Sequence, residues 1–134
     1  KNFNKKQIYS LIKLSKKLIK KYSIKNKYIL GHSDIAPLRK KDPGEKFPWK
    51  ILSKKNIGIW HNYKKKIKNR FIDVKSTDLK NEFFLKLRKY GYSINSKNLL
   101  DKRKIIKVFQ MRFRPEKVNG IIDFETYNIL KTLN

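Results

Sequence analysis

The residues best suited to chemistry lie in one short stretch, Gly31 to Gly44. His32 is one of only two histidines in the 134 residues; Asp42 follows it by ten residues, and Lys40 lies two residues before Asp42. Zinc binds imidazole nitrogen and carboxylate oxygen, and a catalytic zinc keeps one position open for water. An ammonium group nearby would stabilise a carbonyl oxygen that becomes negative when water attacks. The stretch therefore predicts a metal site beside a cation, with a packed histidine and a capping aspartate as the alternative.

The surrounding sequence predicts how these side chains are brought together. The apolar triplet Tyr28-Ile29-Leu30 predicts a short strand that ends just before His32, and open α/β sheets commonly place sites at the carboxyl ends of strands. Pro37 and Pro43 restrict φ, so less entropy is lost when the loop closes around an ion. Asp34 is expected to bind loop amides or to orient the imidazole, and not to act in catalysis.

The same stretch carries a family signature. Read as Gly-His-Ser-Asp-Ile-Ala-Pro-x-Arg-Lys-x-Asp-Pro-Gly, residues 31–44 resemble the signature of zinc-dependent N-acetylmuramoyl-L-alanine amidases of the AmiD-like branch, with twelve of fourteen positions specified. Phe47-Pro48-Trp49 and Ile57-Gly58-Ile59-Trp60 are similar to the next segments of that family. The resemblance implies a peptidoglycan hydrolase that cleaves the amide bond between N-acetylmuramic acid and L-alanine.

The resemblance also assigns roles to individual residues. It implies that His32 and Asp42 bind Zn²⁺ and that Lys40 assists catalysis. The positions predicted to contact the substrate are Ala36, Arg39 and Trp49. A guanidinium can meet a substrate carboxylate or simply be solvated, and a tryptophan after proline can line a groove or fill a core. The sequence leaves both alternatives open.

Part of the family's active site is missing from this sequence. The resemblance covers only the C-terminal part of the amidase domain, and the family's first zinc-binding histidine and catalytic glutamate lie on earlier strands. His61 is the only other histidine and follows the signature, so we expect it to be exposed in a loop. Two protein ligands rarely hold a catalytic zinc, which normally takes three. The chain is therefore predicted to be incomplete as a catalyst and inactive alone.

The remaining patterns predict the fold. Residues 4–23 have hydrophobic side chains at helical spacing and lysines on the other face, which predicts a helix packed on a sheet or, alternatively, lying on a membrane. Three short helices follow Asp78, with Gly91 ending the first, Pro115 stopping the second and Asp123 capping the third. The predicted fold is α/β, a mixed sheet with flanking helices, followed by a small all-α three-helix bundle.

These elements predict two domains. The C-terminal part of an amidase domain is expected at residues 1–61, a charged linker at 62–78 and a peptidoglycan-binding domain at 79–134. The second domain resembles the three-helix peptidoglycan-binding type through the ordered motifs Leu87-x-x-Tyr90-Gly91-Tyr92, Val108-Phe109-Gln110 and Asn119-Gly120-x-x-Asp123-x-x-Thr126. An unrelated helical bundle is the alternative, and a wall-binding module without catalysis is the alternative function.

The composition limits the partners. The net charge is +26, from 36 basic and 10 acidic residues, and charge of this size often indicates a nucleic-acid binder. However, the basic residues are spread along the whole chain, and 30 lysines outnumber 6 arginines although arginine makes the better phosphate and base contacts. We therefore expect peptidoglycan or a muropeptide as partner and no nucleic acid; a basic nucleic-acid-binding protein is the weaker alternative.

The absence of cysteine excludes disulfides and thiolate ligands. No apolar run approaches the roughly 20 residues that cross a bilayer, so membrane contact is expected only through an anchor upstream of the chain. The expected location is the periplasm or outer membrane of a Gram-negative bacterium, and the sequence does not predict the oligomeric state.

Overall fold

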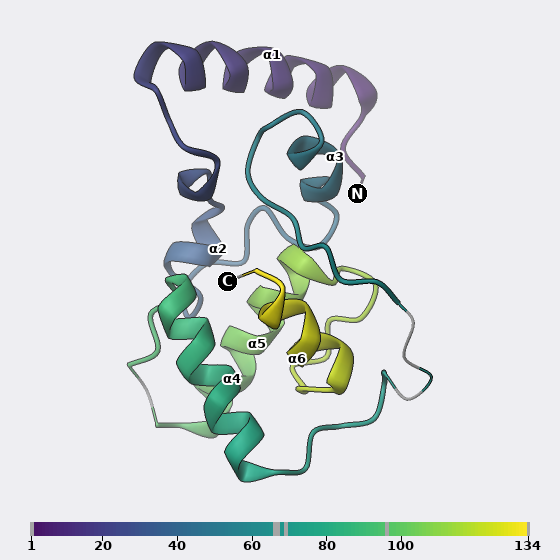
Figure 1. Ribbon diagram of the computed structural model, residues 1–134. Helices are drawn as coiled ribbons and strands as arrows, with labels where there is room; N and C mark the ends of the chain where they lie inside the picture. Colours follow the sequence, from purple (N-terminus) through teal and green to yellow (C-terminus); the bar gives the residue numbers. More distant parts are fainter. Residues whose placement is uncertain (1, 66–67, 69, 96, 134) are drawn as a thin grey trace.

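The computed structural model describes residues 2–65, 68, 70–95 and 97–133, and in these ranges the protein is built from helices and loops (Figure 1). The elements, in chain order, are α1 (Lys5–Tyr22), the 3₁₀ helix η1 (Asn26–Tyr28), α2 (His32–Ile35), α3 (Trp49–Ser53), α4 (Thr77–Tyr90), α5 (Leu99–Phe113) and α6 (Phe124–Lys131). In Figure 1, α1 lies across the top with α3 beneath it, and α4, α5 and α6 form the lower part.

The predicted α/β fold with a mixed sheet is wrong. Among the described residues the only β pairing is an isolated antiparallel bridge between Asp73 and Asp123. The predicted strand at 28–30 instead follows a 3₁₀ turn, in which the amides of Tyr28 and Ile29 donate to the carbonyls of Lys25 and Asn26 at 2.9 and 3.2 Å. Because the turn uses these donors, they are not available to a neighbouring strand.

The first helix is confirmed, but it covers a small hydrophobic cluster and not a sheet. Asn4 caps α1 by accepting a hydrogen bond from the Gln7 amide at 2.8 Å. The cluster consists of buried Trp49, Leu52 and Ile57, and the α1 residues packed against it are Leu11, Ile12 and Ile19. None of the α1 residues is itself buried, so α1 lies on the outside of this cluster.

The three helices predicted after Asp78 are present and share a larger core. Phe83 and Leu87 of α4, Phe109 of α5 and Leu130 of α6 are fully buried in it. Val74, inside the predicted linker, is also buried there, and its amide donates to the Ile122 carbonyl at 2.8 Å. The chain before α4 therefore packs on the bundle.

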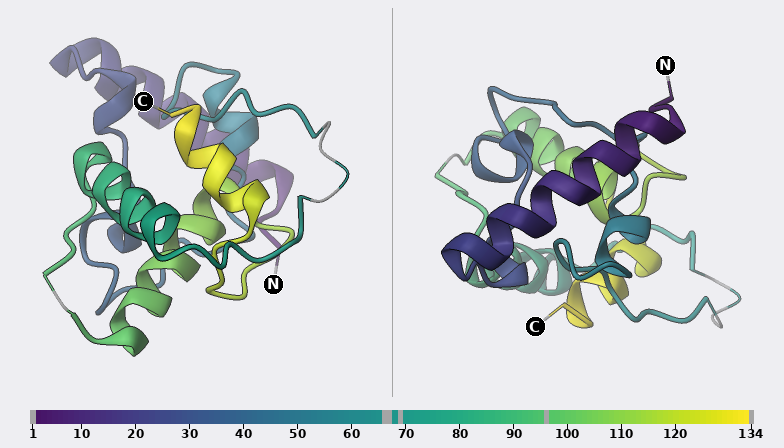
Figure 2. Two further views of the ribbon diagram at one scale, coloured as in Figure 1. Left: turned by 60° about the horizontal axis from the view of Figure 1, so that its bottom comes forward. Right: turned by 90° about the horizontal axis from the view of Figure 1, so that it is seen from above.

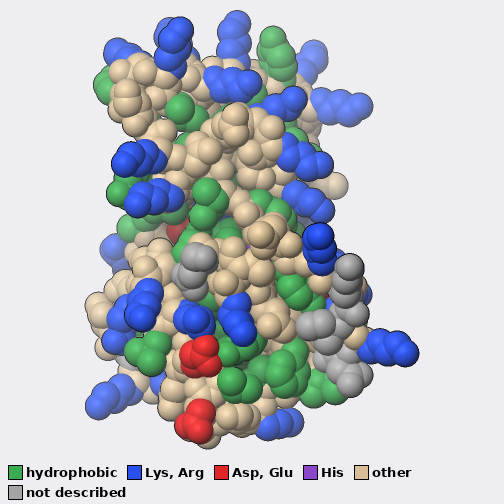
Figure 3. All heavy atoms as spheres, in the orientation of Figure 1, with side chains coloured by type: hydrophobic (Ala, Val, Ile, Leu, Met, Phe, Trp, Pro, Cys, Tyr) green, Lys and Arg blue, Asp and Glu red, His purple; other side chains and the backbone are tan. Residues whose placement is uncertain are grey.

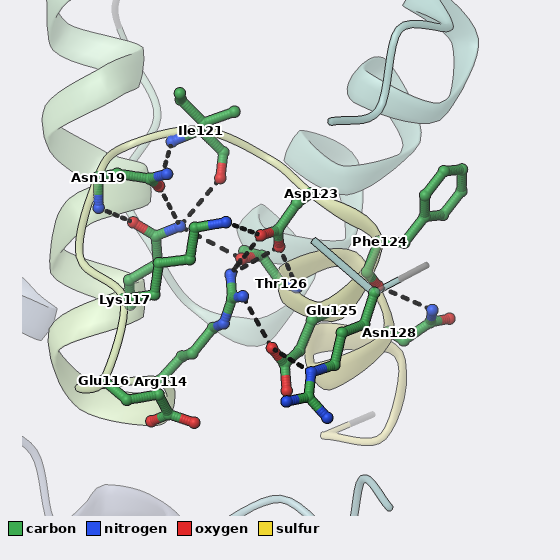
Figure 4. Close-up of polar contacts among 12 residues, drawn as sticks. Arg114, Glu116, Lys117, Asn119, Ile121, Asp123, Phe124, Glu125, Thr126 and Asn128 are labelled. Atoms are coloured by element: carbon green, nitrogen blue, oxygen red, sulfur yellow. Dashed lines mark hydrogen bonds and ion pairs between the residues drawn. The ribbon is translucent and has the colours of Figure 1, made fainter. Parts of the chain in front are cut away.

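The bundle encloses a buried ionic cluster around Arg114, just after α5 (Figure 4). Arg114 is 0% exposed; its guanidinium donates to both carboxylate oxygens of Asp123 at 2.6 and 2.8 Å and to Glu125 at 2.7 Å. Asp123 also accepts from the Thr126 amide at 2.9 Å, which confirms the predicted cap of α6. One arginine thus ties the end of α5 to the start of α6.

The face of the molecule drawn in Figure 3 is basic. Figure 3 shows lysine and arginine side chains scattered from α1 at the top to the bundle at the bottom, with few acidic side chains between them. Among the described residues, none of the helices combines the length and the apolar composition that a membrane span requires.

Candidate active site

The structure brings His32 and Asp42 together. His32 is the first residue of α2, and the Ser33 amide donates to the Asp42 carbonyl at 3.0 Å, which folds the loop back on the helix. The Nδ1 atom of His32 then lies 2.5 Å from Oδ2 of Asp42. The two side chains are 72% and 59% exposed, so they face solvent together.

The backbone around this pair is closely packed. A Cβ atom on Gly31 would lie 2.6 Å from Cδ of Pro43, so only glycine fits where the two ends of the loop meet. Gly44 closes the loop with a φ of +79°, a conformation that glycine adopts readily. The signature glycines therefore allow the approach of His32 and Asp42.

Lys40 supplies positive charge beside the pair. Its amide donates to the Ala36 carbonyl at 2.9 Å, within the turn that leads back to Asp42. The hydrogen bond from His32, together with the charges of His32 and Lys40, holds the pKa of Asp42 below its ordinary value. Asp42 is thus held as a carboxylate, the form that binds metal.

The predicted substrate-binding residues lie in different surroundings. Arg39 is exposed and, like Lys40, lines a groove beside α5, whereas Ala36 is half-buried at the end of α2. Trp49 is only 5% exposed and belongs to the small hydrophobic cluster under α1. The surface that Trp49 keeps lines a separate pocket with Trp60 and Pro115.

A buried carboxylate anchors the site loop to the bundle. Asp34 is 7% exposed, and it accepts hydrogen bonds from the Gly31 amide at 2.8 Å and the Tyr92 hydroxyl at 2.7 Å. The first contact confirms that Asp34 binds a loop amide. The imidazole of His32 pairs with Asp42 instead, so Asp34 does not orient it.

Arg112 of α5 completes this anchor. Its guanidinium donates to Asp34 Oδ2 at 2.5 Å and to the Ile29 carbonyl at 3.2 Å, and it stacks on the Trp49 ring with its central carbon 3.8 Å from the ring centroid. We call Asp34, Tyr92 and Arg112 the anchor cluster. It links the turn that carries His32 to two parts of the bundle.

Tyr92 of the anchor cluster and its neighbour Tyr90 predict a loss of stability at high pH. Burial raises the pKa of Tyr90, which stacks on Tyr92, to about 12, and burial also raises the pKa of Tyr92 well above its usual range. Above about pH 10 these tyrosines ionise in the unfolded chain but stay neutral in the folded protein, because their folded-state pKa exceeds the ordinary value of 10.0. The free energy of unfolding is therefore unaffected by the two tyrosines below about pH 10 and decreases as the pH rises towards 12.

Urea unfolding between pH 9 and pH 12 would test this prediction. Tyr90→Phe keeps the ring and removes the ionisable hydroxyl, so the variant should lose less stability than the wild type across this range. Equal losses in the two proteins would contradict the shifted pKa of Tyr90.

The donor set fits a metal only in part. Imidazole and carboxylate are donors that zinc prefers, and His32 and Asp42 are exposed and adjacent. Among the described residues, however, no group of three or more His, Cys, Asp or Glu side chains is placed to hold a metal ion. The described part of the chain therefore places two candidate donors together, whereas a catalytic zinc normally takes three.

Sequence reasoning missed two features of this region. His61, expected to be exposed, has a half-buried imidazole that lies 4.8 Å from the Trp60 ring, and burial lowers its pKa. The role of Arg112 was also missed, although an arginine between apolar residues of a predicted helix was a usable signal in a chain with only six arginines.

The comparisons with known proteins agree with the signature. Residues 1–45 match the Amidase_2 family model, described as N-acetylmuramoyl-L-alanine amidase. Over 135 aligned residues the chain is 37% identical to the N-acetylmuramoyl-L-alanine amidase AmiD of Escherichia coli strain K12, which covers 98% of this chain and 48% of AmiD.

Solved structures give the same result. The complex of AmiD from Escherichia coli with the substrate anhydro-N-acetylmuramic acid-L-Ala-D-γ-Glu-L-Lys matches with a TM-score of 0.83 and 35% identity, covering 98% of this chain and 52% of AmiD. The complex of AMPDH3 from Pseudomonas aeruginosa with an anhydromuramic pentapeptide matches with a TM-score of 0.83 and 32% identity, covering 100% of this chain and 54% of that one. The chain thus spans about half the length of the relatives that it matches. In its signature, sequence and structure, the chain is similar to the AmiD-like N-acetylmuramoyl-L-alanine amidases.

Proposed function

We propose that this chain forms part of a zinc-dependent peptidoglycan amidase that hydrolyses the bond between N-acetylmuramic acid and L-alanine in the cell envelope. The observation that supports this most directly is the exposed contact between His32 and Asp42, with Lys40 charge beside it. Bound zinc would supply an activated water for attack on the amide carbonyl. The substrate class is that of the AmiD and AMPDH3 complexes, a muropeptide.

The residues of this chain have separate tasks in the proposal. His32 and Asp42 hold the metal, and the lowered pKa of Asp42 keeps the carboxylate ready to bind it. Lys40 places an ammonium group where the carbonyl oxygen becomes negative, and preorganised charge of this kind stabilises a transition state. Arg39 meets a carboxylate of the peptide, and Ala36 lines the substrate site. Trp49, which is buried in the small hydrophobic cluster, has no direct task in the proposal. The third donor comes from outside the described residues.

Zinc titration tests whether His32 and Asp42 bind the metal. The wild-type chain should bind zinc with a dissociation constant above about 1 µM, because two donors are too few for tight binding. His32→Ala combined with Asp42→Ala should abolish this binding, and Lys40→Ala should leave it unchanged. Tight one-to-one binding by the wild type would contradict the two-donor site.

A hybrid enzyme tests the activity itself. In AmiD of Escherichia coli, the part that matches this chain would be replaced by this chain, and cleavage of a muropeptide would be measured. We expect an active hybrid, no activity after His32→Ala, and about a tenfold to a hundredfold lower kcat after Lys40→Ala with little change in KM. A large rise in KM with unchanged kcat would contradict the role of Lys40.

A wall-binding module without catalysis is the second candidate. It is supported by the three-helix bundle over residues 77–131, where the ordered motifs resembling a peptidoglycan-binding domain lie. This function predicts that the chain sediments with insoluble peptidoglycan and that the hybrid enzyme is inactive, whereas the amidase function predicts an active hybrid.

A further inference from the structure

A basic groove runs between the site loop and α5. Its volume is about 550 Å³, within the roughly 300–1,000 Å³ typical of ligand pockets. One wall is the segment from Pro37 to Lys41, and the other is the middle of α5 with Val118. Both views of Figure 2 show the loop after α2 running alongside α5. The groove therefore begins at Lys40 and continues onto the bundle.

The groove has one sign of charge and an apolar floor. Its cationic side chains are Arg39, Lys40, Lys41, Lys104 and Lys107, and none of the described residues that line it is acidic. Leu38, Val108 and Met111 supply the apolar surface. Among the described residues, the ion pair that involves one of these cations joins Lys104 to Asp101 at 3.9 Å, and Lys104 is still 59% exposed. These charges are therefore available to a ligand.

The anchor cluster fixes the two walls relative to each other. Arg112 lies on the same helix as Lys104 and Lys107, and it binds Asp34 in the turn that precedes the loop wall. Both members of this ion pair are buried, with 3% and 6% of their side chains exposed. Because the pair is held away from water, the bundle wall keeps its place beside Lys40.

We propose that this groove binds the peptide part of the substrate, so that α5 of the bundle forms part of the substrate site. This inference rests on the proposed function. Alternating carboxylates and methyl groups, as in L-Ala-D-γ-Glu, fit a groove with basic walls and an apolar floor. The carboxyl group of the sugar in a muropeptide is bound in the scissile amide and is uncharged, so charge complementarity favours the peptide.

The probe is N-acetyl-L-alanyl-D-glutamate, which carries two carboxylates, and its control is the diamide, which carries none. Binding to the whole metal-free chain would be followed by amide chemical shifts. We expect the largest shifts at the amides of residues 38–41 and 104–111, and no measurable binding of the diamide. The affinity of the probe should fall as salt is added.

Two variants with the same charge change separate the groove from the general charge of the protein. Lys104→Gln with Lys107→Gln should weaken binding about tenfold. Lys16→Gln with Lys17→Gln, on exposed positions of α1, removes two charges elsewhere and should change affinity less than about twofold. Equal losses in both variants, an unchanged groove variant, or no binding by the wild type would each overturn the proposal.

The outcome is distinct from that of the proposed function. Peptide binding is measured without metal and without cleavage, so the groove can be confirmed even if zinc binding and the hybrid enzyme both fail. Conversely, an active hybrid whose kcat/KM is unaffected by the loss of Lys104 and Lys107 would retain the amidase function and reject the groove.

Discussion

Replacing Arg114 with methionine is expected to lower the free energy of unfolding by about 3–5 kcal/mol. Methionine keeps much of the apolar volume of the side chain but removes the hydrogen bonds that Arg114 donates to the carboxylates of Asp123 and Glu125, which are 0% and 1% exposed. The remaining cations are too few to compensate, with Lys117 at 3.1 Å from Asp123 and Arg70 at 3.8 Å from Glu125. A small domain has only about 5–15 kcal/mol of stability, so the loss is large.

Chemical denaturation of this variant needs two controls. Arg103→Met removes an exposed arginine whose recorded hydrogen bonds to the Asn119 carbonyl are long, at 3.4 and 3.5 Å, and should cost less than about 1 kcal/mol. Adding Asp123→Asn and Glu125→Gln to Arg114→Met should restore part of the loss, because no buried charge is then left unpaired. A loss below about 1 kcal/mol for Arg114→Met would mean that the buried cluster is not energetically important.

Replacing Arg112 with methionine is expected to cost about 2–4 kcal/mol and to loosen the turn that carries His32. Asp34 would keep only the Tyr92 hydroxyl and the Gly31 amide as donors, and the Ile29 carbonyl and the Trp49 ring would each lose a contact. Hydrogen exchange at the Gly31 and Ser33 amides should accelerate in this variant, because the anchor holds the segment on which both lie.

A double-mutant cycle with Asp34→Asn isolates the ion pair. If the buried contact matters, the single variants and the double variant should give a coupling energy of about 2–3 kcal/mol. A coupling energy near zero, or unchanged hydrogen exchange around His32, would show that the bundle does not brace the site. The cycle also reports on the groove, since Arg112 holds its two walls together.

The local features of the helices could be predicted from the sequence because their signals lie within a few residues. The Asp123 cap contacts an amide three residues later, and the amide of Gly91, just after α4, bonds to the carbonyl of Leu87 at 3.2 Å. The apolar spacing of residues 4–23 likewise belongs to a single helix. The contact between His32 and Asp42 is also local, because the two residues are ten positions apart and one loop brings them together.

The predicted strand failed because a strand needs a partner that its own residues do not specify. Tyr28 and Leu30 looked like buried strand residues, but they are 64% and 42% exposed, and the local turn uses the backbone donors. Likewise, the surroundings of Trp49 and His61 depended on distant parts of the chain. Arg112 stacks on Trp49, and His61 lines a pocket together with Pro115 and Glu116.

By itself the sequence determined α1, α4, α5 and α6 and the family signature, since each depends on residues close together in the chain. Only the tertiary structure decided that Asp34 pairs with Arg112 across 78 residues, and that Lys40 shares a groove with α5. The physical reason is that a buried ion pair forms only where packing excludes water from both partners at once. The sequence contains both charged residues, but its composition and periodicity do not show that Asp34 and Arg112 form an ion pair.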